Sequence, residues 1–232
     1  MAKRTASRKR KPKFTDEQIG ELIWNTHSCN IDPTHRELYL HGYHMEFAED
    51  GEEPGVDYRM ATIFEKNLNI LDRLGDSNVL IHMHTNGGCW NDGMAVYDCI
   101  KQSKSPTTVL AYSHSRSMSS IIPMAADLRI IHANCDFMIH LGTMFMGDRA
   151  KAFLTEAEQL KKSNAIMLDI YYNVIKDSKV FKDKTETYIK NFLNKKMDKH
   201  DDWYLNAEEA VHYGFYDGIL GSKEYPDIAS IR

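Results

Sequence analysis

The hydrophobic pattern of this sequence changes repeatedly between helical spacing and strand spacing. The predicted helices are 15–28, 57–74, 91–104, 118–126, 148–176, 186–194 and 207–212. The predicted strands are 36–40, 78–84, 107–113, 128–132, 137–140 and 215–220. Strands that alternate with helices in this way are typical of βαβ units. The pattern therefore predicts an α/β fold with a largely parallel sheet covered on both faces.

Three segments are expected to lie outside this regular pattern. The acidic run 46–55 contains glycine and proline and predicts a surface loop. The helix 148–176 is long enough to project from the body, and its apolar residues need not face the sheet. Such a projecting helix favours contact with another subunit. Together with the next helix it forms a long helical region over about 148–195.

Charge separates a short tail from the rest of the chain. The first 13 residues hold seven basic and no acidic residues, whereas the remainder holds 22 basic and 33 acidic residues. We expect residues 1–14 to be a disordered basic tail, which either binds an acidic partner such as nucleic acid or serves only solubility. Residues 15–232 are long enough for one domain.

Composition excludes several classes of protein. Hydrophobic residues make up 42% and charged residues 27% of the chain, and no apolar run is long enough to cross a bilayer. The basic N-terminus lacks the apolar stretch of a secretory signal, so a cytoplasmic location without membrane contact is expected. The four cysteines show no CxxC spacing and are expected to be reduced packing residues: Cys29, Cys89, Cys99 and Cys135.

Four local features could carry chemistry, although each also has a structural interpretation. Gly87-Gly88 ends a strand and could present backbone amides to an anion, or form an ordinary turn. Ser117 precedes a helix and could be a nucleophile or an N-cap, and nearby serines compete for either role. His140 ends an apolar strand, where histidines are often structural. Asp201 and Asp202 lie in an acidic run that is typical of a solvated surface. Acyl transfer needs all four kinds of group.

Taken in order, these segments resemble the ClpP family of serine peptidases, which shares the ClpP/crotonase fold of stacked βαβ units. The resemblance covers about Arg36 to Leu220. It rests on Asn86-Gly87-Gly88 with the helix segment 93–98, Arg116-Ser117-Met118-Ser119, Met138-Ile139-His140, and Asp202-Trp203-Tyr204 followed by Ala207, Glu209-Ala210, Tyr213-Gly214 and Asp217. The order of the four matches is more specific than any one of them.

The resemblance implies a role for each of these residues. Ser117 would be the nucleophile, His140 the general base and Asp202 the residue that orients the histidine, with Asp201 as the fallback. The backbone amides of Gly88 and Met118 would form the oxyanion hole. The resemblance implies no cofactor and no metal.

The resemblance also implies partners. They are polypeptide substrates, other copies of the chain joined through the long helix into stacked heptameric rings, and an AAA+ unfoldase. The basic N-terminus does not resemble the family's axial entrance segment, which argues against the unfoldase.

Three positions depart from the family pattern. They are Asn86 for a proline, Ser119 for a glycine, and Leu141-Gly142 for Gln-Pro. Ser119 is expected to add bulk beside the nucleophile, and Leu141-Gly142 to alter the substrate groove. These departures are typical of a divergent relative, such as a phage-encoded member.

Three other interpretations stay open at this point. An enoyl-CoA hydratase-like enzyme would need a carboxylate near the glycine turn and no serine nucleophile, and a scaffold protein would keep the fold without activity. A metal site is suggested only by two histidine pairs, His82 with His84 and His41 with His44, and no spaced third ligand completes it.

Overall fold

The computed structural model describes residues 14–41, 55–143 and 149–232. Residues 1–13 of the basic tail, most of the predicted loop 46–55, His44 and the predicted start of the long helix at 148 lie outside these residues. The α-helices are α1 (Asp16–Cys29), α2 (Tyr58–Leu74), α3 (Trp90–Gln102), α4 (Met118–Ile121), α5 (Ala150–Ile175), α6 (Glu186–His200) and α7 (Ala207–Tyr213), and two 3-10 helices are η1 (Ile122–Ala125) and η2 (Ile228–Ile231).

A mixed sheet of mainly parallel strands forms the centre of the molecule. Its strands are β1 (Ile31–Asp32), β2 (Glu37–His41), β3 (Val79–Thr85), β4 (Thr107–Arg116), β5 (Leu128–His132), β6 (Asp136–Ile139), β7 (Trp203–Leu205) and β8 (Gly218–Leu220). The order is β1-β2-β3-β4-β5-β8, and β6 pairs with the far end of β4 and with β7. In the described part of the sheet, two pairs are antiparallel: β1 with β2, and β6 with β7. The architecture is the predicted α/β fold.

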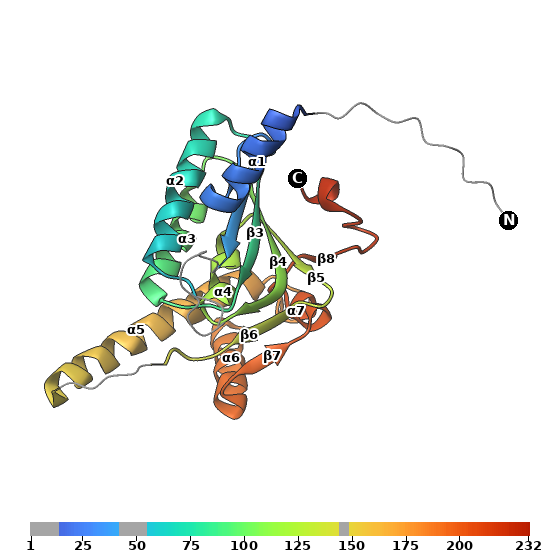
Figure 1. Cartoon of the computed structure of the whole chain (residues 1–232). Helices are drawn as coiled ribbons and strands as arrows, with labels where there is room; N and C mark the ends of the chain where they lie inside the picture. The colour runs from blue at the N-terminus through green and yellow to red at the C-terminus, as the bar shows by residue number, and fades with distance from the viewer. Residues whose placement is uncertain (1–13, 42–54, 144–148) are drawn as a thin grey trace.

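The two faces of the sheet are covered differently. On one side lie α2 and α3 (Figure 1), and buried Leu40, Ile81 and Val109 belong to the large core on this side. On the other side the C-terminal segment crosses the strands, and Ile231 packs with Leu80 in a smaller cluster. This second face is thus covered by the C-terminal segment rather than by α2 and α3.

Several boundaries differ from the sequence prediction for physical reasons. The helix expected over 118–126 is a short α-helix that tightens into η1, where Pro123 removes a backbone donor. The strand expected over 107–113 continues to Arg116, because the polar Ser115 is fully buried and hydrogen-bonded. The helix α6 continues to His200 because Met197 packs in the core one turn after Leu193.

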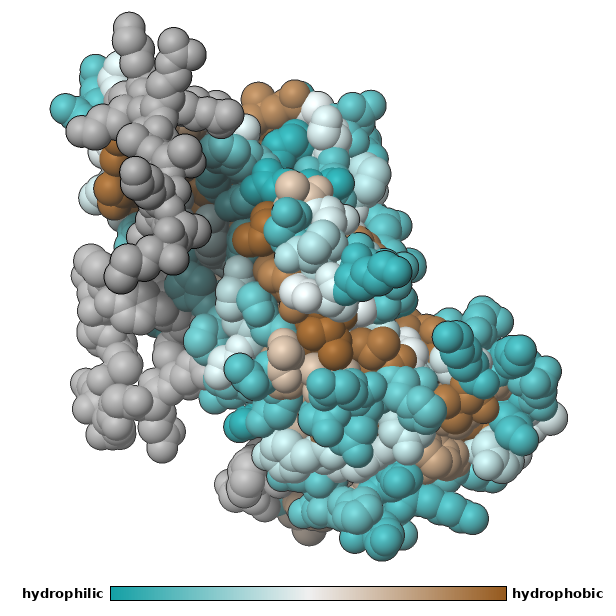
Figure 2. Space-filling model, turned by 90° about the vertical axis from the view of Figure 1, so that its right-hand side faces the viewer, coloured by the Kyte–Doolittle hydropathy of each residue, from teal (hydrophilic) through white to brown (hydrophobic). Residues whose placement is uncertain are grey.

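Helix α5 is the longest helix described and projects from the body of the molecule (Figure 1). The side viewed in Figure 2 is mainly hydrophilic, with hydrophobic side chains in a strip through its middle and in separate smaller patches elsewhere. Within the described ranges, no helix combines the length and apolar character needed to cross a membrane.

Candidate active site

Ser117 lies in the tight connection between β4 and α4. Its backbone has φ 51° and ψ −125°, a conformation that costs a non-glycine residue free energy. A serine on such a strand-to-helix turn holds its hydroxyl out at the end of the sheet, as a nucleophile requires. The Ser117 side chain makes no capping hydrogen bond to α4, so the N-cap interpretation fails.

Hydrogen bonds on both sides hold this strained turn in place. The Ser117 amide donates to the Met138 carbonyl at 3.0 Å, which ties the turn to β6. The Ser120 hydroxyl donates to the Ser117 carbonyl at 2.5 Å and lies 2.6 Å from the hydroxyl of the fully buried Tyr171 of α5. The turn is therefore fixed by buried groups rather than by its own preference.

The glycine pair packs directly against the serine turn. A Cβ atom on Gly87 would lie 2.7 Å from the Ser117 Cβ and 2.8 Å from the Arg116 carbonyl oxygen, and its φ is 107°. A Cβ atom on Gly88 would lie 2.3 Å from the Val56 amide nitrogen. Both positions need glycine because two backbone segments approach closely there.

The register of two strands places the histidine beside the aspartate. In the antiparallel pair of β6 and β7, Ile139 faces Trp203, so the next residues along each strand, His140 and Asp202, lie opposite each other. The Oδ1 atom of Asp202 lies 3.2 Å from Nδ1 of His140. Asp201, the fallback, has φ 60° at the end of α6 and lies one position outside this register.

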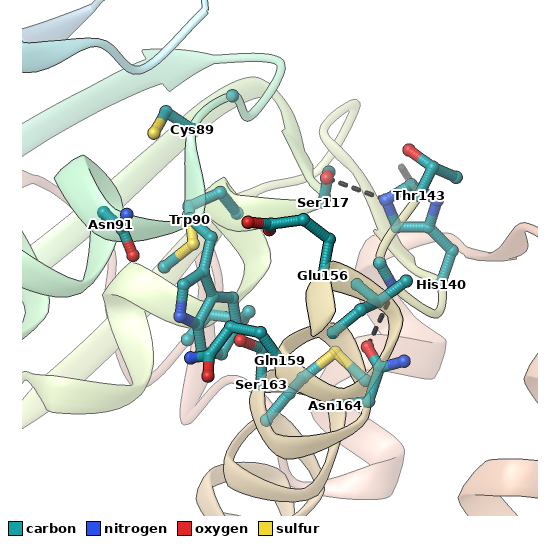
Figure 3. Close-up of a pocket in the computed structure, with 16 residues that line it drawn as sticks. Cys89, Trp90, Asn91, Ser117, His140, Thr143, Glu156, Gln159, Ser163 and Asn164 are labelled. Atoms are coloured by element: carbon teal, nitrogen blue, oxygen red, sulfur yellow. Dashed lines mark hydrogen bonds between the residues drawn. The ribbon is translucent and has the colours of Figure 1, made fainter. Parts of the chain in front are cut away.

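The histidine also reaches the serine, which comes from the neighbouring strand. His140 Nε2 and Ser117 Oγ are hydrogen-bonded at 2.7 Å, as Figure 3 shows. With the Nδ1 proton directed at the Asp202 carboxylate, Nε2 is left free to accept the Ser117 hydroxyl proton. The structure thus places His140 between Ser117 and Asp202, in contact with both, as acyl transfer requires.

The two amides expected to form an oxyanion hole border the same cavity. Gly88 and Met118 line a cavity of about 370 Å³ that also contains Ser117 and His140. Met118 is the first residue of α4, so its N–H has no acceptor within the helix. Donors in this position can stabilise negative charge on a reacting carbonyl oxygen.

The departures from the family pattern have unequal effects on the cavity. Ser119 is fully buried, and its hydroxyl finds no hydrogen-bond partner among the described residues. It does not line the cavity, so the expected bulk beside the nucleophile is directed elsewhere. Gly142 does line the cavity, and its amide donates to Asn164 Oδ1 of α5 at 2.9 Å.

Other residues of the cavity escaped the sequence analysis. Cys89, taken as a packing residue, is exposed and lines the cavity, so that interpretation is wrong for this cysteine. Trp90 comes from the start of α3, and Glu156 comes from α5. No local signal marked Glu156, because α5 reaches the cavity only through tertiary packing.

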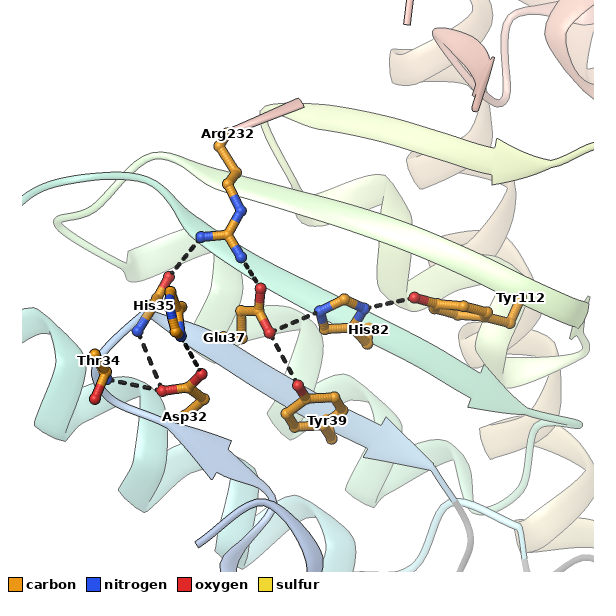
Figure 4. Close-up of polar contacts among 8 residues, drawn as sticks. All are labelled: Asp32, Thr34, His35, Glu37, Tyr39, His82, Tyr112 and Arg232. Atoms are coloured by element: carbon orange, nitrogen blue, oxygen red, sulfur yellow. Dashed lines mark hydrogen bonds and ion pairs between the residues drawn. The ribbon is translucent and has the colours of Figure 1, made fainter. Parts of the chain in front are cut away.

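The histidine pairs considered for metal binding are otherwise engaged or lie partly outside the described residues. His82 Nδ1 is 2.7 Å from the Tyr112 hydroxyl and its Nε2 is 3.3 Å from Glu37, as Figure 4 shows. His84 stacks edge-on with His114, with ring centroids 5.0 Å apart. Within the described residues, no group of three or more potential ligands is placed to hold a metal ion.

Comparisons with known proteins agree on one family. The family model described as Clp protease matches residues 53–223, well over half of the chain. The ATP-dependent Clp protease proteolytic subunit of Deinococcus radiodurans is 25% identical over 71% of this chain and 76% of the relative. The corresponding subunit of Streptococcus uberis is 25% identical over 73% and 82%. Proteolytic subunit 1 of Chlamydia muridarum is 27% identical over 62% and 70%.

Proposed function

Because the chain belongs to the Clp protease family, we propose that it is a serine endopeptidase that hydrolyses peptide bonds with Ser117, His140 and Asp202. The observation that carries the proposal is the hydrogen bond of 2.7 Å between Ser117 Oγ and His140 Nε2, formed beside the amides of Gly88 and Met118. A strained serine in contact with an oriented histidine is the arrangement that activates a hydroxyl as a nucleophile.

Each step of the reaction uses one of these groups. Ser117 Oγ attacks the carbonyl carbon of the scissile peptide bond while His140 Nε2 takes its proton. The amides of Gly88 and Met118 stabilise the oxyanion, and His140 then protonates the leaving amine. Water, deprotonated by His140, hydrolyses the resulting ester and restores Ser117. Asp202 holds the imidazole in the required tautomer and stabilises its charged form.

The activity is tested by comparing wild type with Ser117→Ala on casein and on short fluorogenic peptides. Wild type should cleave both, and the variant should lose on the order of a thousandfold or more in turnover because no nucleophile remains. Equal cleavage by the two proteins would remove Ser117 from the reaction and refute the proposal.

We also infer that the protein assembles through α5 into rings that enclose the active sites. The projecting α5 leaves Phe153, Leu154 and Ile166 between 46 and 65% exposed, a pattern that favours a subunit interface. We expect stacked heptameric rings, in which polypeptide substrates are selected by whether they can enter the chamber. Light scattering at micromolar concentration should show a multimer, and a clean monomer would contradict the assembly.

The two rival functions are separated by chemical labelling. A serine-reactive fluorophosphonate should label assembled wild-type protein, whereas a scaffold protein or an enoyl-CoA hydratase-like enzyme would resist it. The contact between Ser117 and His140 favours the peptidase, because a hydratase needs no such pair. An unfoldase partner, an acidic partner for residues 1–13 and a cytoplasmic location remain predictions from the sequence.

A further inference from the structure

The cavity beside Ser117 is lined by apolar side chains and by the carboxylate of Glu156. Met118, Ile121 and Met167 line it, and each side chain is almost completely buried. These three side chains give an apolar surface on which a long aliphatic chain can pack. The apolar surface alone would favour any large hydrophobic substrate residue.

Glu156 makes the cavity different from a simple hydrophobic pocket. Its side chain extends from α5 into the cavity, toward the side lined by Trp90 and Ser117, as Figure 3 shows. Among the described residues that line the cavity, Glu156 is the one carboxylate, and none is a lysine or an arginine. A cationic group that enters the cavity therefore meets an acceptor and no like charge from these residues.

We propose that Glu156 is a specificity-determining residue that favours lysine or arginine in the substrate side chain bound beside Ser117. This inference rests on the proposed peptidase function. A lysine or arginine side chain combines an aliphatic stem with a charged end, so the stem can pack on Met118 and Ile121 while the charge reaches the Glu156 carboxylate. Arginine can in addition bind a carboxylate through two hydrogen bonds.

The size of the preference follows from the exposure of Glu156. The residue is exposed in the single chain, so its attraction for a cation is screened by water and salt. Exposed ion pairs contribute about 0.2 to 1 kcal/mol, which corresponds to a preference of roughly 1.4- to fivefold. The preference should shrink as ionic strength rises.

The test compares two peptide series that differ only in the charge of one side chain. Peptides with lysine before the scissile bond are paired with peptides that carry norleucine, which keeps the aliphatic stem and lacks the ammonium group. Wild type should cleave the lysine peptide with a kcat/KM roughly 1.4- to fivefold higher than that of the norleucine peptide. Glu156→Gln should bring this ratio to about one or below, and Glu156→Lys should lower it further.

The matched control is Glu158→Gln. Glu158 also lies on α5, but it pairs with Lys161 at 2.7 Å and does not line the cavity. This variant should keep the wild-type ratio. A ratio that is unchanged by Glu156→Gln, or a wild-type preference for norleucine, would overturn the proposal.

A binding experiment separates this inference from the proposed reaction. The same peptides, labelled with a fluorophore, are titrated into Ser117→Ala protein and into the double variant that also carries Glu156→Gln. Fluorescence anisotropy should show tighter binding of the lysine peptide only when Glu156 is present. If wild type cleaves nothing but this difference is seen, the proposed function fails while the role of Glu156 stands. If wild type cleaves the peptides but this difference in binding is absent, the proposed function stands and the role of Glu156 fails.

Discussion

His82 should make the stability of the fold depend on pH over a defined range. Its side chain is only 11% exposed, and burial lowers its pKa from 6.5 to about 4. Glu37 lies 3.3 Å away and would favour the charged imidazole, but its carboxylate is shared with Tyr39 and Arg232 (Figure 4). Loss of hydration therefore dominates, and the neutral form is preferred in the fold.

The sign and size of the effect follow from the two pKa values. Because the folded pKa lies below the unfolded one, the unfolded chain binds the proton first as pH falls. The contribution is fully present above about pH 6.5 and is lost as pH falls toward 4. One pKa unit corresponds to about 1.4 kcal/mol, so the total is about 3 kcal/mol.

The assay is urea unfolding at a fixed protein concentration between pH 7 and pH 4. Wild type and His82→Gln are compared, so that acidic residues titrating in both proteins cancel. Wild type should lose about 3 kcal/mol more than the variant over this range. The control His212→Gln removes an exposed histidine from the end of α7. Equal losses in wild type and His82→Gln would refute the reasoning.

Three further changes probe the candidate site. Asp202→Asn should lower kcat by several orders of magnitude without unfolding the protein. Asp201→Asn should have little effect, because Asp201 lies one position outside the strand register. Equal effects of the two changes would contradict the assigned register. Gly87→Ala should lower the free energy of unfolding by about 2 kcal/mol or more and reduce fluorophosphonate labelling. The reason is that φ at this position is 107° and the added Cβ would press on the serine turn. An unchanged midpoint of urea unfolding would contradict this. Tyr171→Phe should cost about 1 kcal/mol in the same assay by removing a buried hydrogen bond, and a neutral effect would show that the bond does not support the turn.

Much of the fold was readable because hydrophobic spacing is a local property. Helices such as α2 and strands such as β3 bury one face or both, and their patterns gave boundaries within a residue or two. The strand β7 was missed because three residues carry too little pattern, and its pairing with β6 depends on a contact between segments far apart in the sequence. Which segment covers the second sheet face was not readable, because the C-terminal segment reaches it only through tertiary contacts such as that of Ile231.

The candidate site, like the fold, was predictable from the sequence only in part. Ser117, His140 and Asp202 were selected from the sequence as a combination, since no one of them was distinctive alone. The choice of Asp202 over Asp201 gains support from the register of β6 and β7, which the sequence did not reveal. The positive φ of Ser117 was also hidden, because the turn is imposed by buried neighbours rather than by a glycine at that position. Glu156 enters the cavity from a helix that follows Ser117 by many residues, so no motif includes it.

The account depends most on whether the Ser117 hydroxyl is activated by His140. The most direct measurement is the rate of fluorophosphonate labelling of assembled protein, with the modified residue identified by mass spectrometry. Wild type should be labelled at Ser117, and His140→Ala should slow labelling by at least a hundredfold, on the order expected for loss of a general base. Labelling at another residue, or equal rates in the two proteins, would contradict the account.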